Sequence, residues 1–372
     1  MPSYRRRLFG PIVLLLLSVW LSGCTNPLTL FSQPTEEAAA DSPPADEPIT
    51  GTLTIYTTMG EEQTNAYLRL FRGAYPGVEV TVVTMDISPL LQQLLAEKED
   101  PQADVIWGLS ATAMALLEWQ DVLIPYAPEG LDRVYLQFRD TRTPPYWVGF
   151  GAWMSAFCVN NERLEALNLP KPDSWKSLRD PIYAGQIAVP RPDLSATGYM
   201  IVAAQLEFYG EVQGWEDLDA LDKNVKVYTE SSYQPCEMAA KGDVAIGVSF
   251  DVAPVNLASA GEPVEAVFAT EGAGWDIEAN GLLRKDDIKD VARLFLDWAI
   301  SDPVMQVYGE SRVVLSMPAE DHSPPPGFPE QPLTLLYDKD FPWASANRER
   351  ILAEWLARYA AKLEEQSPVA AP

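Results

Sequence analysis

Small hydroxyl residues recur at four points where an expected strand gives way to an expected helix. Backbone N–H groups at a helix start have no partner within the helix, and with hydroxyl groups they can hold an anion. Any one segment also fits an ordinary N-cap, because Ser and Thr cap helices widely. Four of them, divided between two series of elements, suggest two lobes that close on one small anion. The segments are Thr57-Thr58, Ser110-Ala111-Thr112, Ser195-Ala196-Thr197-Gly198 and Ser231-Ser232-Tyr233.

The elements that must position these segments form two β/α series. Short runs typical of strands alternate with stretches in which apolar residues recur at helical spacing. This alternation predicts an α/β fold with mostly parallel, doubly wound sheets, in which ligands bind beyond the carboxyl ends of the strands. The expected strands are 53–56, 78–82, 104–107, 186–189, 225–228 and 244–250, and a different pattern follows, with strands at 264–268 and 277–283 and helices at 291–300 and 351–363.

The composition excludes several classes of function. The chain has 372 residues, enough for two domains and a sizeable core. It has 53 acidic and 27 basic residues, a net charge of −26, which argues against a nucleic-acid partner because such a partner requires a basic surface. One histidine, His322, excludes a site of several histidines or a His-based triad within one chain. We expect no metal and no cofactor.

Two motifs of enzyme active sites do not occur in the sequence. They are the phosphate-binding loop G-x-x-x-x-G-K-[ST] and the nucleophile elbow G-x-S-x-G. A pair of carboxylates of the glycosidase kind stays open, since acids are abundant. The tryptophans Trp107, Trp153, Trp215 and Trp275 are expected in the core rather than against a ligand. We therefore expect a binding protein with no catalytic residues, and keep a surface hydrolase as the alternative.

The first 24 residues predict an export signal and a lipid anchor. Arginines at 5–7 precede an apolar run, Pro11 to Leu21, that is too short for the ~20 residues of a membrane-spanning helix. Leu21-Ser22-Gly23-Cys24 then resembles the lipobox of bacterial lipoproteins, where cleavage before the cysteine leaves it lipidated. We expect a signal peptide at 1–23, a tether rich in proline and acids at 24–50, and an extracytoplasmic protein anchored to the cell membrane through Cys24. A plain secretory signal with a chance cysteine is the alternative.

Two further cysteines, Cys158 and Cys236, stand 78 residues apart in the sequence. An even pair in an oxidising compartment suggests a disulfide, which would constrain a long loop of the unfolded chain. Two separate buried thiols are the alternative.

Several stretches in order resemble one family. From about Leu53 to Tyr359 the chain is similar to the extracytoplasmic solute-binding proteins of ABC importers, and within them to the 2-aminoethylphosphonate-binding branch, which neighbours the ferric-iron-binding proteins. The stretches that carry the resemblance are Asp104–Leu109, Thr229–Cys236, Gly247–Phe250, Gly274–Ala279 and Asn347–Leu352 with Trp355.

The resemblance implies a two-lobe, hinged fold of the second periplasmic-binding type. Lobe one would comprise 51–155 plus 252–365, lobe two 156–251, and 366–372 would be a disordered tail. It further implies a monomer that captures a small anionic or zwitterionic solute, such as a phosphonate, and delivers it to an ABC permease in the membrane.

Two departures from the family pattern bear on the solute. The iron-binding relatives use adjacent tyrosines, whereas Ser231-Ser232-Tyr233 offers one, which disfavours iron. Ala196 stands where the aminophosphonate branch would have a second serine, which leaves the anionic head group open. Iron, polyamines, thiamine and organophosphates therefore stay as alternative solutes.

Position along the chain predicts the binding residues. The ligand's anionic head would lie between the lobes, two tyrosines would close the pocket, and one acid at the end of a strand near the hinge would bind an ammonium tail. The head would be held by Thr57, Thr58, Ser110, Ser195, Thr197, Gly198 and Ser232, the closing tyrosines are Tyr199 and Tyr233, and the acid is Asp251.

The lipobox gives the first testable prediction. Substituting Cys24→Ser removes the thiol that would carry lipid, so we expect the variant to leave the membrane fraction and appear as soluble protein. Cell fractionation with immunoblotting measures this. A Cys24→Ser protein that still sediments with membranes would place the anchor elsewhere.

Overall fold

The computed structural model describes residues 49–366. The expected signal peptide, Cys24, nearly all of the tether and residues 367–372 lie outside this range. None of the helices between residues 49 and 366 combines the length and the apolar composition that a bilayer crossing requires.

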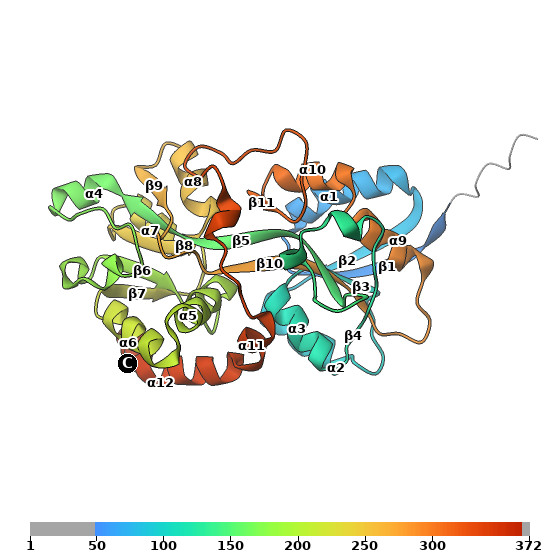
Figure 1. The fold of residues 1–372 in the computed structure, drawn as a ribbon, viewed down its shortest axis with the longest axis horizontal. Coiled ribbons are helices and arrows are strands. Elements are labelled where there is room, and N and C mark those ends of the chain that lie inside the picture. Colours follow the sequence, from blue (N-terminus) through green and yellow to red (C-terminus); the bar gives the residue numbers. More distant parts are fainter. Residues whose placement is uncertain (1–48, 367–372) are drawn as a thin grey trace, which may run out of the picture. The chain divides into compact units, whose positions relative to one another are not determined.

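One mixed sheet runs through the described part of the chain, in the strand order β2-β1-β3-β10-β5-β8-β6-β7 (Figure 1). The pairs β1–β2, β1–β3, β6–β7 and β6–β8 are parallel, as the β/α alternation predicts. The central pairs β3–β10, β10–β5 and β5–β8 are antiparallel. The long strands are β1 (Thr50–Thr57), β2 (Gly77–Thr84), β3 (Val105–Ser110), β5 (Trp147–Asn160), β6 (Ile187–Pro190), β7 (Val225–Thr229), β8 (Ile246–Phe250) and β10 (Trp275–Leu283).

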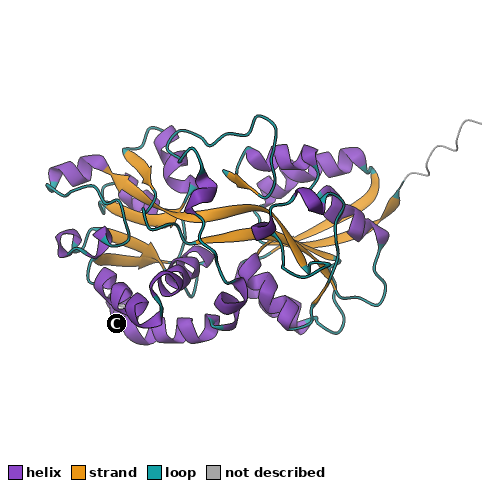
Figure 2. Ribbon diagram, viewed as in Figure 1, coloured by secondary structure: helices purple, strands orange, loops and turns teal. Residues whose placement is uncertain are grey.

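Helices cover both faces of this sheet (Figure 2). We call the part built on β1, β2 and β3 lobe one, and the part built on β6, β7 and β8 lobe two. The helices are α1 (Glu61–Ala74), α2 (Ile87–Ala96), α3 (Ala111–Trp119), α4 (Asn161–Ala166), α5 (Ala196–Tyr209), α6 (Glu211–Asp222), α7 (Gln234–Ala240), α8 (Val252–Ser259), α9 (Asp290–Trp298), α10 (Asp302–Gly309), α11 (Phe341–Ala346) and α12 (Arg348–Gln366). Short strands are β4 (Leu123–Ile124), β9 (Val264–Val267) and β11 (Val314–Leu315), and 3-10 turns are η1 (Leu131–Arg133), η2 (Leu136–Phe138), η3 (Ser177–Arg179), η4 (Pro181–Tyr183) and η5 (Pro332–Leu335).

Strand β5 belongs to both lobes. Its 14 residues pair with β10 from Trp147 to Met154 and with β8 from Ser155 to Val159. The glycine-containing segment Gly149–Gly151 lies within it. Figure 1 shows β5 and β10 running side by side between the lobes.

Each lobe has its own aromatic core. In lobe one the Trp107 ring meets Phe295 edge to face at 5.2 Å, and its indole N–H donates to the Tyr308 hydroxyl at 2.9 Å. This satisfies the polar atom of a fully buried tryptophan. In lobe two Phe157 packs edge to face on Trp175 at 5.0 Å.

Two parts of the segment 252–365, which the resemblance assigned to lobe one, pack with lobe two. Strand β9 pairs with the lobe-two half of β5. On α12, Ile351, Trp355 and Tyr359 are buried in the lobe-two core, and the Trp355 ring lies 5.0 Å from that of Tyr228 on β7. The amphipathic stripe of this helix showed which face is buried, but the partner surface lies more than a hundred residues earlier in the chain.

A disulfide joins β5 to α7 in lobe two. The Cα atoms of Cys158 and Cys236 are 5.3 Å apart and both side chains are fully buried. Gly247 of β8 pairs with Cys158, and a Cβ atom there would collide with the backbone of Pro235. The missing side chain at Gly247 therefore lets α7 approach β5 closely enough for the bond.

Removing this bond is expected to destabilise the protein. The double variant Cys158→Ala and Cys236→Ala should lose about 2–4 kcal/mol of unfolding free energy, because the unfolded chain regains the entropy of a long loop. Chemical denaturation measures the loss, and peptide mapping without reductant checks the bond itself. Equal stability of the double variant, or two freely alkylated thiols in the native protein, would contradict the prediction.

Candidate functional site

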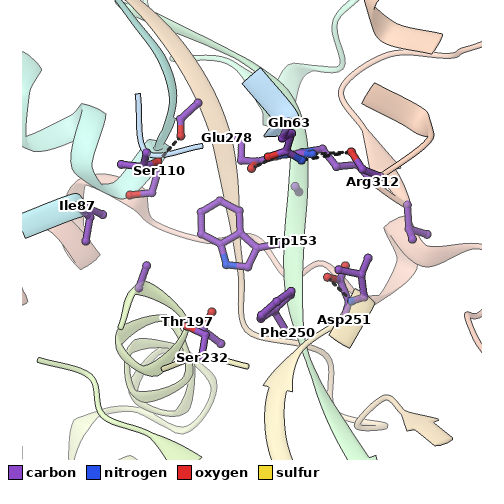
Figure 3. A pocket seen from close by; sticks show the side chains of 17 residues that line it. Gln63, Ile87, Ser110, Trp153, Thr197, Ser232, Phe250, Asp251, Glu278 and Arg312 are labelled. Carbon is purple, nitrogen blue, oxygen red and sulfur yellow. Dashed lines mark hydrogen bonds and ion pairs between the residues drawn. The ribbon is translucent and has the colours of Figure 1, made fainter. Parts of the chain in front are cut away.

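A cavity of about 420 Å³ lies where the lobes meet, between the ends of β1, β3 and β8 and the start of α5 (Figure 3). Its size is that of a site for a small organic molecule. Five of the ten predicted binding residues line it, namely Thr58, Ser110, Thr197, Ser232 and Asp251.

The hydroxyls of lobe one differ in what they can offer a ligand. The Thr58 hydroxyl donates to the Gly108 carbonyl at 2.7 Å, so its proton is engaged. Ser110 caps α3, and its oxygen accepts from the Ala113 N–H at 3.2 Å, so its proton stays available to an anion. Thr57 is fully buried, accepts from the Met59 N–H at 3.0 Å and does not line the cavity.

The hydroxyls of lobe two gather at the start of α5. Ser195 caps the helix by accepting from the Gly198 N–H at 3.1 Å, and its hydroxyl shares a 2.6 Å hydrogen bond with that of Ser232. Ser232 and Thr197 line the cavity, whereas Ser195 and Gly198 do not. Within residues 49–366 no side chain or backbone group hydrogen-bonds the Thr197 hydroxyl, which therefore is free for a ligand.

The structure places the two expected closing tyrosines outside the cavity lining. Tyr199 points away on α5, where its hydroxyl donates to the Ala344 carbonyl of α11. The Tyr233 ring packs against Phe250, with centroids 6.0 Å apart. Helical phase explains Tyr199, because it lies two positions after Thr197 and so faces roughly the opposite side of the helix.

Asp251 is the acid of the cavity whose charge no cation neutralises among the described residues. It is 2% exposed, and its Oδ1 accepts from the Val252 N–H at 3.0 Å at the start of α8. Burial raises the pKa of its carboxyl to about 7, and Glu278 adds to the rise.

An ion pair, which the sequence did not single out, forms another wall. Both guanidinium edges of Arg312 are held, one by Glu278 and the other by the hydroxyls of Tyr67 and Ser311, each at 2.8 Å. Burial alone would lower the pKa of Arg312, but the Glu278 carboxylate outweighs it and raises that pKa above its usual value. The signal was present in β10, where Asp276, Glu278 and Asn280 alternate with apolar residues and so share one face of the strand.

Trp153 departs from its expected place in the core. Its indole projects into the middle of the cavity, between Ser110 and Glu278 on one side and Thr197 and Ser232 on the other (Figure 3).

A second cavity of about 590 Å³ lies between α3 and the segment 333–342. None of the predicted binding residues lines it, and Lys339 there is buried and paired with Asp276 at 3.2 Å. Among residues 49–366, no group of three or more His, Cys, Asp or Glu side chains could hold a metal ion. We therefore place the candidate site in the first cavity.

The raised pKa of Asp251 predicts a pH dependence of stability. An acid whose pKa rises from 3.8 to about 7 on folding takes up a proton between these values, so folding is favoured as the pH falls through this range. Relative to Asp251→Asn, the wild type should gain up to about 4 kcal/mol between about pH 8 and about pH 4. Denaturant unfolding across this range measures the difference.

The matched control is Asp287→Asn, at an exposed acid that does not line the cavity. Its stability should follow that of the wild type at every pH. A constant difference between the wild type and Asp251→Asn would contradict a buried acid that titrates near neutrality.

Comparison with known proteins gives matches to one family. Residues 100–347 match the family described as bacterial extracellular solute-binding protein. A Haemophilus influenzae protein of unassigned function is 30% identical over 268 residues, covering 70% of this chain and 77% of that protein. A probable ABC transporter periplasmic-binding protein of Sinorhizobium fredii, y4fP, is 26% identical over 267 residues, covering 70% and 72%.

Solved structures share the fold. The periplasmic binding protein AfuA of Actinobacillus pleuropneumoniae, with fructose-6-phosphate bound, superposes with a TM-score of 0.72 at 24% identity, covering 82% of this chain and 98% of that one. This likeness confirms the predicted α/β, two-lobe fold of the second periplasmic-binding type.

Proposed function

We propose that this chain, which belongs to the bacterial extracellular solute-binding proteins, captures a small zwitterionic phosphonate or organophosphate for an ABC importer. The observation that carries the proposal is one cavity with free hydroxyls from both lobes on its walls and the buried acid Asp251 beside them. An anionic head would meet the hydroxyls, and an ammonium group would meet the acid.

Three hydroxyls would bind the anionic head, namely Ser110, Thr197 and Ser232. The unpaired N–H groups at the start of α5 lie beside them, since Ala196 also lines the cavity. One helix end contributes only about 0.3–1 kcal/mol to anion binding, whereas a micromolar complex needs about 8 kcal/mol. Donors from both lobes must therefore converge on the same group, which closure of the lobes would achieve.

The cation would bind Asp251. Glu278 is already paired with Arg312, so Asp251 is the acid of the cavity lining whose carboxylate could pair with a ligand cation. An ammonium beside it would favour the ionised carboxylate and lower its pKa from about 7. Affinity for an amine-bearing ligand should accordingly weaken below neutral pH.

The protein would stand outside the cytoplasm as a monomer on a lipidated Cys24, and pass its solute to a membrane permease. Incubation with a phosphonate panel separates this from a surface hydrolase, since saturable binding without product formation supports the receptor and turnover supports the enzyme.

Calorimetry with 2-aminoethylphosphonate on the wild type, Thr197→Val and Asp251→Asn tests the two ends of the ligand separately. Loss of one charge-assisted hydrogen bond costs about 1.5–3 kcal/mol, so each variant should bind roughly ten- to a hundredfold more weakly. Thr334→Val, at an exposed threonine outside the cavity, should bind as the wild type does.

The pattern of affinity loss in the two variants shows which end of the ligand each residue binds. Unchanged affinity in both variants would place binding elsewhere. Loss in Asp251→Asn alone would mean that the ammonium end, not the phosphonate, anchors the ligand.

A further inference from the structure

Trp153 is the one residue of β5 whose side chain is not buried. The other 13 residues of this strand are buried between the covering helices and neighbouring strands. The indole emerges at the cavity, beside the junction where β5 passes from its pairing with β10 to its pairing with β8. A large apolar ring is thus presented to the ligand from the crossing strand itself.

This indole has no partner within the described part of the chain. Its N–H meets no acceptor there, and no other ring or cation packs on its face. Three other tryptophans, Trp107, Trp175 and Trp275, donate this N–H within the chain, and the Trp275 N–H meets the Tyr337 carbonyl at 2.9 Å. An aromatic ring that is partly exposed in a ligand-sized cavity still has apolar contact to make.

The cavity has more room than two charged ends require. At about 30 Å³ of liquid volume per water, its 420 Å³ equals roughly 14 waters. With the lobes placed as in this structure, a two-carbon chain between a phosphonate and an amine would leave much of this space, and the indole, in contact with water. A ring would cover the indole and displace that water.

We infer that the ligand carries a ring between its phosphoryl head and its ammonium group, and that this ring stacks on Trp153. The inference rests on the proposed function and refines its ligand to cyclic amino phosphates. The ring could be an aromatic heterocycle or an amino sugar that turns its C–H face to the indole. Trp153 then determines specificity, while Ser110, Thr197, Ser232 and Asp251 bind the charged ends.

The test compares three probes by calorimetry on the wild type, Trp153→Phe and Trp153→Leu. Pyridoxamine 5′-phosphate has an aromatic ring, glucosamine 6-phosphate has a sugar ring, and 2-aminoethylphosphonate has none. We expect at least one ring probe to bind the wild type about tenfold or more tightly than 2-aminoethylphosphonate. Trp153→Leu should remove about tenfold of that affinity, and Trp153→Phe, which keeps an aromatic face, should retain most of it.

Trp153→Leu should weaken the ring probes more than it weakens 2-aminoethylphosphonate, because only the ring probes stack on the indole. Trp119→Leu, at a tryptophan that is 80% exposed on α3 and outside the cavity, is the matched control and should bind every probe as the wild type does. Thermal unfolding of each variant confirms that it is folded.

The failure of this inference is distinct from that of the proposed function. Binding of 2-aminoethylphosphonate as tight as that of both ring probes would overturn the ring alone. Equal weakening of all three probes by Trp153→Leu would do the same. If none of the phosphoryl compounds binds, the proposed function falls and the inference falls with it.

Discussion

The continuous hydrogen bonding of β5 to both halves of the sheet is the constraint on which the site depends. One strand pairs with β10 and then with β8, so both lobes share a single register. A shift by one residue would turn Trp153 out of the cavity and Cys158 away from Cys236. The same strand fixes Asp251, whose backbone N–H donates to the Met154 carbonyl at 2.8 Å.

The proposed solute carries an anionic group, whereas the protein itself is acidic. A net charge of −26 would repel such a solute at long range, but salt screens that field beyond about 8 Å. Inside the cavity the nearby groups determine the electrostatic interaction with a solute. There Arg312 forms an ion pair with Glu278, so its charge is already neutralised. Breaking this largely buried pair would leave one charge without a partner, which costs more than the pair contributes. An anionic solute, as proposed, would therefore rely on hydroxyls and helix N–H groups.

Local pattern sufficed for the main elements and for finding five residues that line the cavity, because helical and strand periodicity are properties of neighbouring residues. The hydroxyl segments were found where β1 and β3 end and α5 begins. The packing of α12 on lobe two could not be predicted, because an amphipathic stripe shows which face of a helix is buried but not which element covers it. Glu278 could have been recognised from the alternation of polar and apolar residues in β10. No sequence feature near Arg312 indicates that Arg312 pairs with Glu278.

The sequence by itself determined the α/β class, the family resemblance and the loops that meet at the cavity, since strand ends and caps are local features. Only the tertiary structure decided which hydroxyls keep a free proton. The Thr58 hydroxyl donates to the Gly108 carbonyl, whereas the Ser110 hydroxyl only accepts, from the Ala113 N–H. It also showed that Trp153 lines the cavity while Trp107 is buried, although both were expected in the core from the sequence. Exposure to a cavity depends on the residues that pack from other elements, and a linear pattern does not contain that information.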